Sequence, residues 1–348
     1  MEIGGGQVDQ IIDQSAWARQ ARRAAATAVG VSGGLGLLGV AAVGLLVGQA
    51  RMARRVIPLA ESPPPRADGR YGAELPGEPV RMAVLGDSSA AGYGADRPRD
   101  TPAALLAAGL SERIGRPVDV RVQAVVGSTS ARLVPQRELA LEWRPDVAVI
   151  LIGANDVTHR VPIRVAVGHL ADTVALLRAA GAAVVVGTCP DLGTIRPIQP
   201  PLRWLAHRWS RDMATAQTMS VVRAGGATVS LGDLLGPQFA KSPDELFSSD
   251  HFHPSAAGYA AAAAAMLPSL VAAMTPTPPT EPALQDDDGV RSLAQAAAEA
   301  VDRAGTEVSA VEVAAGAGRV RRLTRLRHRV RQLTERPHDP EPGPSLAK

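Results

Sequence analysis

The stretch VRMAVLGDSS at residues 80–89 decides the fold, because an apolar run is followed directly by a Gly-Asp-Ser turn. Residues 80–85 are short, aliphatic and bounded by turn residues, which is the pattern of a strand buried on both faces. Similar runs occur at residues 118–126, 146–152, 182–188 and 226–230. Helix-like segments separate or follow them, near residues 101–114, 130–142, 163–180, 202–224 and 255–272.

Apolar strands that alternate with helices are typical of a parallel sheet covered on both faces. We therefore predict an α/β fold, a three-layer α/β/α domain with a five-stranded parallel sheet, over residues 80–274. Hydrophobic residues make up 46% of the 348 residues and aromatic residues only 3%, so Ala, Val and Leu must build the core. The net charge of +3 gives no reason to expect a nucleic-acid partner.

The N-terminal part contains a long apolar segment, residues 24–50, without a charged residue. About 20 such residues span a bilayer as a helix, so we expect a single-pass transmembrane helix after an N-terminal segment, residues 1–23. A cleaved signal peptide is the alternative, but its apolar core would be much shorter. Arginines flank the segment on both sides, so the side of the membrane that holds the main domain stays open.

Two further segments have the composition of connectors and tails. Residues 51–79 are rich in Pro and Gly and predict a linker. Residues 275–348 begin with a Pro- and Asp-rich connector and continue into a basic stretch that includes Arg319 and Arg331. We expect this tail to be partly helical or disordered. Its basic part suits contact with an anionic membrane surface or a partner, and a solvated tail is the alternative.

Polar turns follow three of the predicted strands, and a fourth polar motif precedes the last helix. The first three turns contain Ser88, Gly127 and Asn155, and the fourth motif contains Asp250 and His253. In open α/β sheets, ligands bind outside the carboxyl ends of the strands. We therefore expect these residues, which are far apart in the sequence, to converge on one crevice.

The residue types in this crevice suit acyl transfer. A serine hydroxyl needs a base to take its proton, and histidine, which titrates near neutrality, is suited to that task. A carboxylate can orient the imidazole, which predicts Ser88 as the nucleophile, His253 as the base and Asp250 as the orienting acid. The backbone N–H groups of Ser88 and Gly127 and the Asn155 amide would form the oxyanion hole.

Each motif also has a simpler interpretation. Ser88 alone could be the cap of a helix, and Asn155 could cap the segment after it. His251 and His253 beside Asp250 could indicate a metal site, but no other cluster of ligands in the sequence supports one. Cys189 is the only cysteine, which excludes an intramolecular disulfide and argues against a Cys–His zinc site.

The order and strand context of the four motifs resemble those of the SGNH hydrolase superfamily, the GDSL esterases and lipases. The matching blocks are Gly86-Asp87-Ser88, Gly127, Gly153-Ala154-Asn155-Asp156 and Asp250 to Pro254. The linker and the motif environment look like those of membrane-anchored actinobacterial members. The resemblance implies a flavodoxin-like sheet, no metal or other cofactor, and ester hydrolysis or acyl transfer through an acyl-serine. Ser89 departs from the pattern, because many members have Leu there.

Three functions are compatible with these motifs. The first is a serine esterase, lipase-like, that acts on an ester-containing lipid or an acylated glycan near the membrane. The second is an acyltransferase that moves the acyl group to a sugar or lipid hydroxyl. The third is a non-catalytic membrane-anchored binding protein, which the complete set of Ser88, His253 and Asp250 disfavours.

Overall fold

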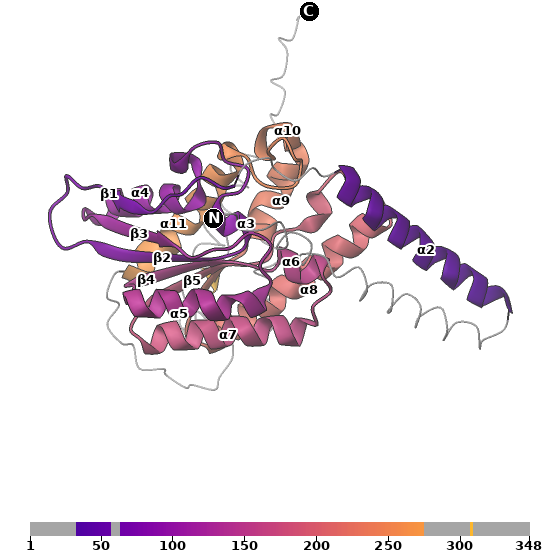
Figure 1. Cartoon of the computed structure of the whole chain (residues 1–348), viewed down its shortest axis with the longest axis horizontal. Helices are drawn as coiled ribbons and strands as arrows, with labels where there is room; N and C mark the ends of the chain where they lie inside the picture. Colours follow the sequence, from indigo (N-terminus) through magenta and orange to yellow (C-terminus); the bar gives the residue numbers. More distant parts are fainter. Residues whose placement is uncertain (1–32, 57–62, 275–306, 309–348) are drawn as a thin grey trace, which may run out of the picture.

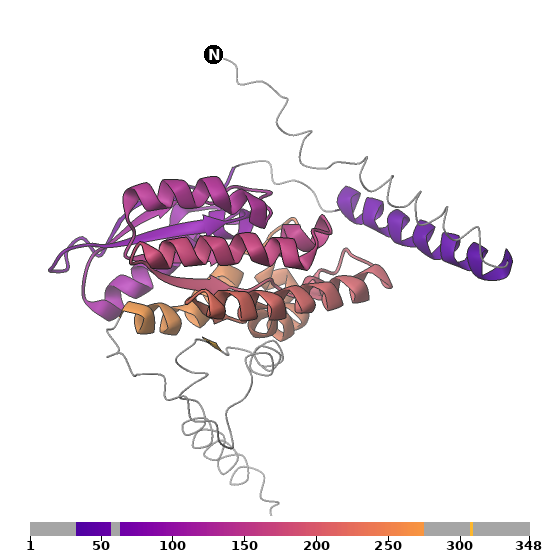
Figure 2. The same cartoon turned by 90° about the horizontal axis from the view of Figure 1, so that it is seen from below.

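The computed structural model of the protein describes residues 33–56, 63–274 and 307–308 (Figures 1 and 2). The predicted N-terminal segment, residues 24–32 of the predicted membrane helix and nearly all of the C-terminal tail lie outside these residues. The strands of the described part are β1 (Gly69–Tyr71), β2 (Val80–Gly86), β3 (Val118–Val122), β4 (Val147–Leu151), β5 (Ala183–Gly187), β6 (Ala227–Val229) and β7 (Glu307–Val308).

These strands form one mixed sheet in the order β1-β3-β2-β4-β5-β6-β7. The strands from β3 to β6 pair in parallel, whereas β1 pairs antiparallel with β3 and β7 antiparallel with β6. The expectation of a five-stranded, wholly parallel sheet is thus incomplete, because each edge carries one short antiparallel strand. In the parallel part the chain reverses its direction of winding at β2, so the ends of β2 and β4 are the position at which open α/β sheets bind ligands.

Helices cover both faces of the sheet, which gives three layers. The helices and 3₁₀ turns are α2 (Gly33–Val56), α3 (Ser88–Ala91), η2 (Pro98–Asp100), α4 (Pro102–Ile114), η3 (Ser130–Arg132), α5 (Leu133–Trp143), α6 (Ala154–Thr158), α7 (Ile163–Ala179), η4 (Leu192–Thr194), α8 (Leu202–Arg223), α9 (Leu231–Lys241), α10 (Pro243–Leu246) and α11 (Ala256–Met274). Helices α5 and α7 lie along one face, and α4 and α11 lie along the other (Figure 1).

The two faces have separate cores because successive side chains of a strand point in opposite directions. Met82 and Val84 of β2 pack with Leu110 of α4 and Leu270 of α11. Ala83 and Leu85 face the other way and belong to the core that contains α5 and α7. Every residue of β2 except Arg81, and every residue of β4, is buried, as expected for strands covered on both sides.

The strand β1 lies inside the segment predicted as a linker. Arg70 at its centre makes two hydrogen bonds to the Asp119 carboxylate of β3, at 2.7 and 2.8 Å. The hydroxyl of Tyr71 donates to the carbonyl of Ala67 at 2.9 Å. The pairing of β1 therefore depends on β3, some 50 positions along the chain, rather than on the composition of the segment itself.

Helix α2 carries residues 33–50 of the predicted membrane segment, about two thirds of it, and continues to Val56. Its side chains Val40 and Leu45 are exposed. The Gln49 amide accepts a hydrogen bond from the Leu202 N–H at 3.1 Å and donates to the Pro200 carbonyl, so α2 meets the domain at the start of α8. The apolar part of α2 within the described residues, Gly39–Ala53, is shorter than a bilayer span.

Helix α11 is the one described helix that has both the length and the apolar composition to cross a membrane. Its side chains Tyr259, Met266 and Leu270 are fully buried. They pack against α4 and the sheet, which is the place of a core helix in a folded domain.

Candidate active site

The turn after β2 presents Ser88 at the carboxyl edge of the sheet. Gly86 has a φ of +138°, and a Cβ there would lie 1.9 Å from the Leu151 carbonyl oxygen of β4. Only glycine therefore allows the chain to turn so close to its neighbour. Asp87 caps α3 by accepting a hydrogen bond from the Ser89 N–H at 2.9 Å. Ser88 becomes the first residue of α3, with its hydroxyl directed toward His253.

The loop before α11 holds an acid and an imidazole in contact. Asp250 Oδ2 lies 2.6 Å from His253 Nδ1. The other carboxylate oxygen accepts hydrogen bonds from the Ser248 hydroxyl and from the N–H groups of Phe252 and His253, at 2.8, 2.8 and 2.9 Å. Burial by itself would raise the pKa of Asp250, but these bonds and the His253 ring lower it to about 2. Asp250 is therefore an anion at neutral pH.

The imidazole links this loop to the serine turn. His253 Nε2 lies 2.9 Å from Ser88 Oγ, although 165 positions separate the two residues in the chain. The rings of Tyr93 and Phe252 meet the imidazole edge-on, with centroids 4.5 and 4.9 Å away. The imidazole ring is thus held by a hydrogen bond at each nitrogen and by edge-on contacts with the rings of Tyr93 and Phe252.

Gly127 and Asn155 lie in the two turns that flank the serine. Gly127 has a φ of +78°, which suits glycine. Asn155 Nδ2 donates one hydrogen to the Ser128 carbonyl at 3.0 Å, which leaves its second hydrogen for another acceptor. The buried carboxylate of Asp156 accepts hydrogen bonds from the N–H and hydroxyl of Ser130, so the two turns are joined.

Ser88, His253 and Asp250 lie in one hydrogen-bonded chain, and Asn155 is bonded to Ser128, the neighbour of Gly127. His251 is exposed and has a φ of +53°. The described residues contain no group of three His, Cys, Asp or Glu side chains that could hold a metal ion. The Cys189 thiol is buried, and burial raises its pKa well above the ordinary value, so it stays protonated at neutral pH.

Three buried polar residues of this region were not predicted as part of the site. The Gln136 amide of α5 accepts a hydrogen bond from the Gly86 N–H at 2.7 Å and donates to the Gly86 carbonyl at 3.0 Å. Gln217 of α8 joins the Cys189 N–H to the Ile152 carbonyl. Asp87 is buried beside Ser88, and burial, with a smaller contribution from Asp156, raises its pKa to about 7. The glutamines occupy ordinary helical positions, so the sequence carries no signal for their contacts.

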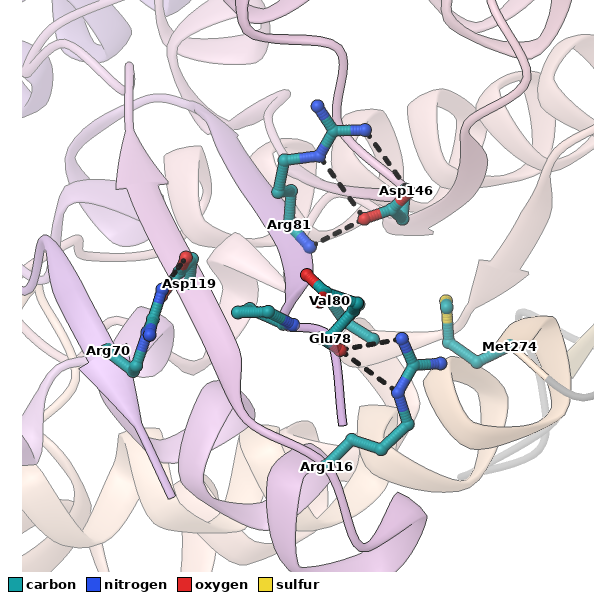
Figure 3. A pocket seen from close by; sticks show the side chains of 9 residues that line it. Arg70, Glu78, Val80, Arg81, Arg116, Asp119, Asp146 and Met274 are labelled. Carbon is teal, nitrogen blue, oxygen red and sulfur yellow. Dashed lines mark hydrogen bonds and ion pairs between the residues drawn. The ribbon is translucent and has the colours of Figure 1, made fainter. Parts of the chain in front are cut away.

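A separate cleft of about 590 Å³ lies at the opposite, amino end of the strands (Figure 3). Its arginines are engaged by the protein itself. Arg70 bonds to Asp119, Arg81 to Asp146, and Arg116 to the Glu78 carbonyl. The cleft is thus polar, internally paired and remote from Ser88, and it contributes nothing to the serine site.

Comparisons with known proteins identify the family of the chain. The profile of the GDSL-like Lipase/Acylhydrolase family matches residues 84–261, about half of the chain. The GDSL-like esterase Rv1075c of Mycobacterium tuberculosis is 43% identical over 268 residues, which cover 73% of this chain and 85% of the relative.

Solved structures with a similar chain path include TesA, at 22% identity and a TM-score of 0.47, which covers 56% of this chain and 99% of that one. Phospholipase A1 from Streptomyces albidoflavus NA297 has 18% identity and a TM-score of 0.46, with 56% and 99% covered. The extent of the profile match and the 43% identity decide the family. The chain belongs to the GDSL-like lipase/acylhydrolase family, within the SGNH superfamily, and is an ester hydrolase of the serine type.

Proposed function

We propose that the protein hydrolyses carboxylic esters through an acyl-serine intermediate, with Ser88, His253 and Asp250 as its catalytic triad. The observation that supports this is the unbroken hydrogen-bonded chain from Ser88 Oγ through His253 to Asp250, with distances of 2.9 and 2.6 Å. Both contacts lie within the reach expected between a nucleophile, its base and the group that orients the base.

In the first half of the reaction, His253 Nε2 takes the proton of Ser88 as Oγ attacks the ester carbonyl. Asp250 keeps the proton of the ring on Nδ1 and stabilises the imidazolium that forms. The imidazolium then gives its proton to the departing alkoxide, which leaves as an alcohol. In the second half, His253 takes a proton from water, the hydroxide attacks the acyl-serine, and the acid departs as Ser88 recovers its proton.

The carbonyl oxygen becomes negative in both tetrahedral states and needs donors. We assign this role to the backbone N–H groups of Ser88 and Gly127 and to the Asn155 amide hydrogen that Ser128 does not use.

Val125 and Val126, next to Gly127, are exposed apolar residues on the same turn. They favour an acyl chain, rather than a charged group, in front of the site. A membrane lipid or an acylated glycan is the substrate class that we propose.

We propose further that α2 and the apolar residues before it anchor the catalytic domain, residues 80–274, to a membrane. Exposed Val40 and Leu45 support a lipid environment for this helix. Figure 1 shows α3 and α6 at the carboxyl end of the strands and α2 leaving the domain on the same side. Carbonate washing of membranes from expressing cells tests the anchor. Retention of the full chain in the pellet is expected, and complete release would contradict it.

Labelling with a fluorophosphonate probe tests the chemistry. The probe reacts with an activated serine, so we expect the label on Ser88 after peptide mapping and none in Ser88→Ala. Ser89→Ala is the matched control, because it removes the neighbouring hydroxyl but keeps the N–H that bonds to Asp87. Labelling of Ser88→Ala to the wild-type level would refute the assignment. Product analysis with a sugar acceptor present separates hydrolysis from acyl transfer.

A further inference from the structure

A buried amide, that of Gln136, touches two turns of the active site. Gln136 lies on α5, is 2% exposed, and uses all of its hydrogen-bonding groups within the protein. Its oxygen accepts from the Gly86 N–H, and its nitrogen donates to the Gly86 carbonyl and to Ser128 Oγ, at 2.7, 3.0 and 3.3 Å.

The bonds to Gly86 have a clear local cause. Strand β3 ends at Val122, and beyond it the chain stays beside β2 through the bonds of Gln123 N–H to Val84 and of Val125 N–H to Gly86. The N–H of Gly86 needs an acceptor there, because an unpaired buried backbone group is costly. Gln136 supplies it, and so fixes the last residue of β2 at the point where the serine turn begins.

The third bond connects this anchor to the oxyanion donors. Ser128 follows Gly127 and is itself buried. Its hydroxyl accepts from Gln136, while its carbonyl accepts from Asn155 Nδ2 at 3.0 Å. Ser128 therefore accepts one hydrogen bond from Gln136, which holds the serine turn, and another from Asn155, which is assigned to the oxyanion hole.

We propose that Gln136, acting through Ser128, is a positioning residue that sets the distance between the Ser88 hydroxyl and the donors of the oxyanion hole. The inference rests on the proposed function, because it concerns the geometry of that same site. Donors stabilise the transition state only when they are placed for the oxygen of the tetrahedral state. Loss of the link should therefore weaken stabilisation of the tetrahedral state more than binding of the ester.

The test uses the full chain in detergent, with p-nitrophenyl butyrate as substrate and phenylboronic acid as a mimic of the tetrahedral state. Removal of a direct oxyanion donor lowers kcat by about 10²–10³-fold, so we expect a smaller loss, roughly 10- to 100-fold, in Gln136→Met. KM should change by less than about threefold, and the affinity for the boronic acid should fall in parallel with kcat/KM. Active sites are counted by saturating fluorophosphonate labelling, so unfolded molecules do not enter the rate.

Ser128→Ala is the second variant, which removes the hydroxyl but keeps the carbonyl that Asn155 uses. It should show part of the same loss, and the double variant should lose no more than Gln136→Met alone, because both changes break one link. Ser111→Ala is the control for destabilisation. Its buried hydroxyl bonds to the Arg116 and Tyr71 carbonyls at the far end of the domain, so its loss should lower Tm and leave kcat per active site unchanged.

The outcomes separate the two proposals. If wild-type protein neither turns over the ester nor reacts with the probe at Ser88, the proposed function fails. If the wild type is active and Gln136→Met and Ser128→Ala keep wild-type kcat and boronic acid affinity per active site, the positioning role is refuted and the proposed function stands.

Discussion

The buried carboxyl of Asp87 makes a specific prediction about stability and pH. Asp87 is 2% exposed, beside the Ser88 turn, and its pKa is raised from 3.8 to about 7 by burial, with Asp156 nearby. In the unfolded chain the pKa returns to its ordinary value. The two pKa values differ by about three, and each pKa unit corresponds to about 1.36 kcal/mol. The shift therefore changes the free energy of unfolding by roughly 4 kcal/mol.

The sign follows from which state holds the proton. Between about pH 4 and pH 7 the folded protein keeps the Asp87 proton that the unfolded chain has lost, so folding becomes less favourable as pH rises. The stabilisation is complete below pH 4 and is lost once pH has passed about 7. Asp87→Asn is neutral at every pH, and its side-chain oxygen can still accept from the Ser89 N–H. The variant should match the wild type near pH 4 and exceed its stability by roughly 4 kcal/mol near pH 8.

Urea unfolding at pH 4, 6 and 8, followed by far-UV circular dichroism, measures this difference. The variant with Asp172→Asn, an exposed aspartate on α7, controls for the removal of one charge. Other carboxyl groups also titrate in this range. The comparison is therefore the free energy of unfolding of the wild type minus that of the variant at each pH. A difference that stays constant from pH 4 to pH 8, or that favours the wild type as pH rises, would refute the reasoning.

The remaining predictions concern single contacts. Asp250→Asn should lower kcat by about 10⁴-fold with little change in KM, because Asn favours the wrong tautomer of His253; activity on a p-nitrophenyl ester within tenfold of wild type would contradict this. Gly86→Ala should prevent folding, as judged by circular dichroism, because the new Cβ would meet the Leu151 carbonyl at 1.9 Å. Gly168→Ala, where nothing lies within 4 Å, should leave stability unchanged or raised. Tyr259→Phe should lower the free energy of unfolding by about 1–3 kcal/mol, because the Tyr93 carbonyl loses its 2.6 Å hydrogen bond; equal urea midpoints would show that this bond contributes nothing.

Much of the domain could be predicted from local pattern. The apolar runs at residues 80–85, 146–152 and 182–188 coincide closely with β2, β4 and β5. Strands that are buried on both faces cannot tolerate polar residues, so they stand out from the sequence around them. The position of the Ser88, Gly127 and Asn155 turns at one edge also follows from a general property of parallel sheets, whose carboxyl ends meet there. The His253 loop precedes helix α11 instead, and its contact with Ser88 was expected from the motif pattern.

Other features depend on contacts that local sequence does not record. The short strand β1 was predicted as linker because Gly69 and its neighbours are turn-forming residues, and its pairing is made by distant Asp119. The run predicted at residues 118–126 ends as a strand at Val122, because the chain leaves regular pairing to form the Gly127 turn. Gln136 is one glutamine among several on helices, and only the position of α5 beside Gly86 gives it a role.

Asp250 and His253 share a single short loop, whereas Ser88 lies on a different part of the scaffold. Any outward swing of that loop withdraws acid and base as one piece and leaves behind an alcohol of ordinary reactivity. The fraction of time that the loop spends seated against Tyr93 would then set the ceiling on turnover.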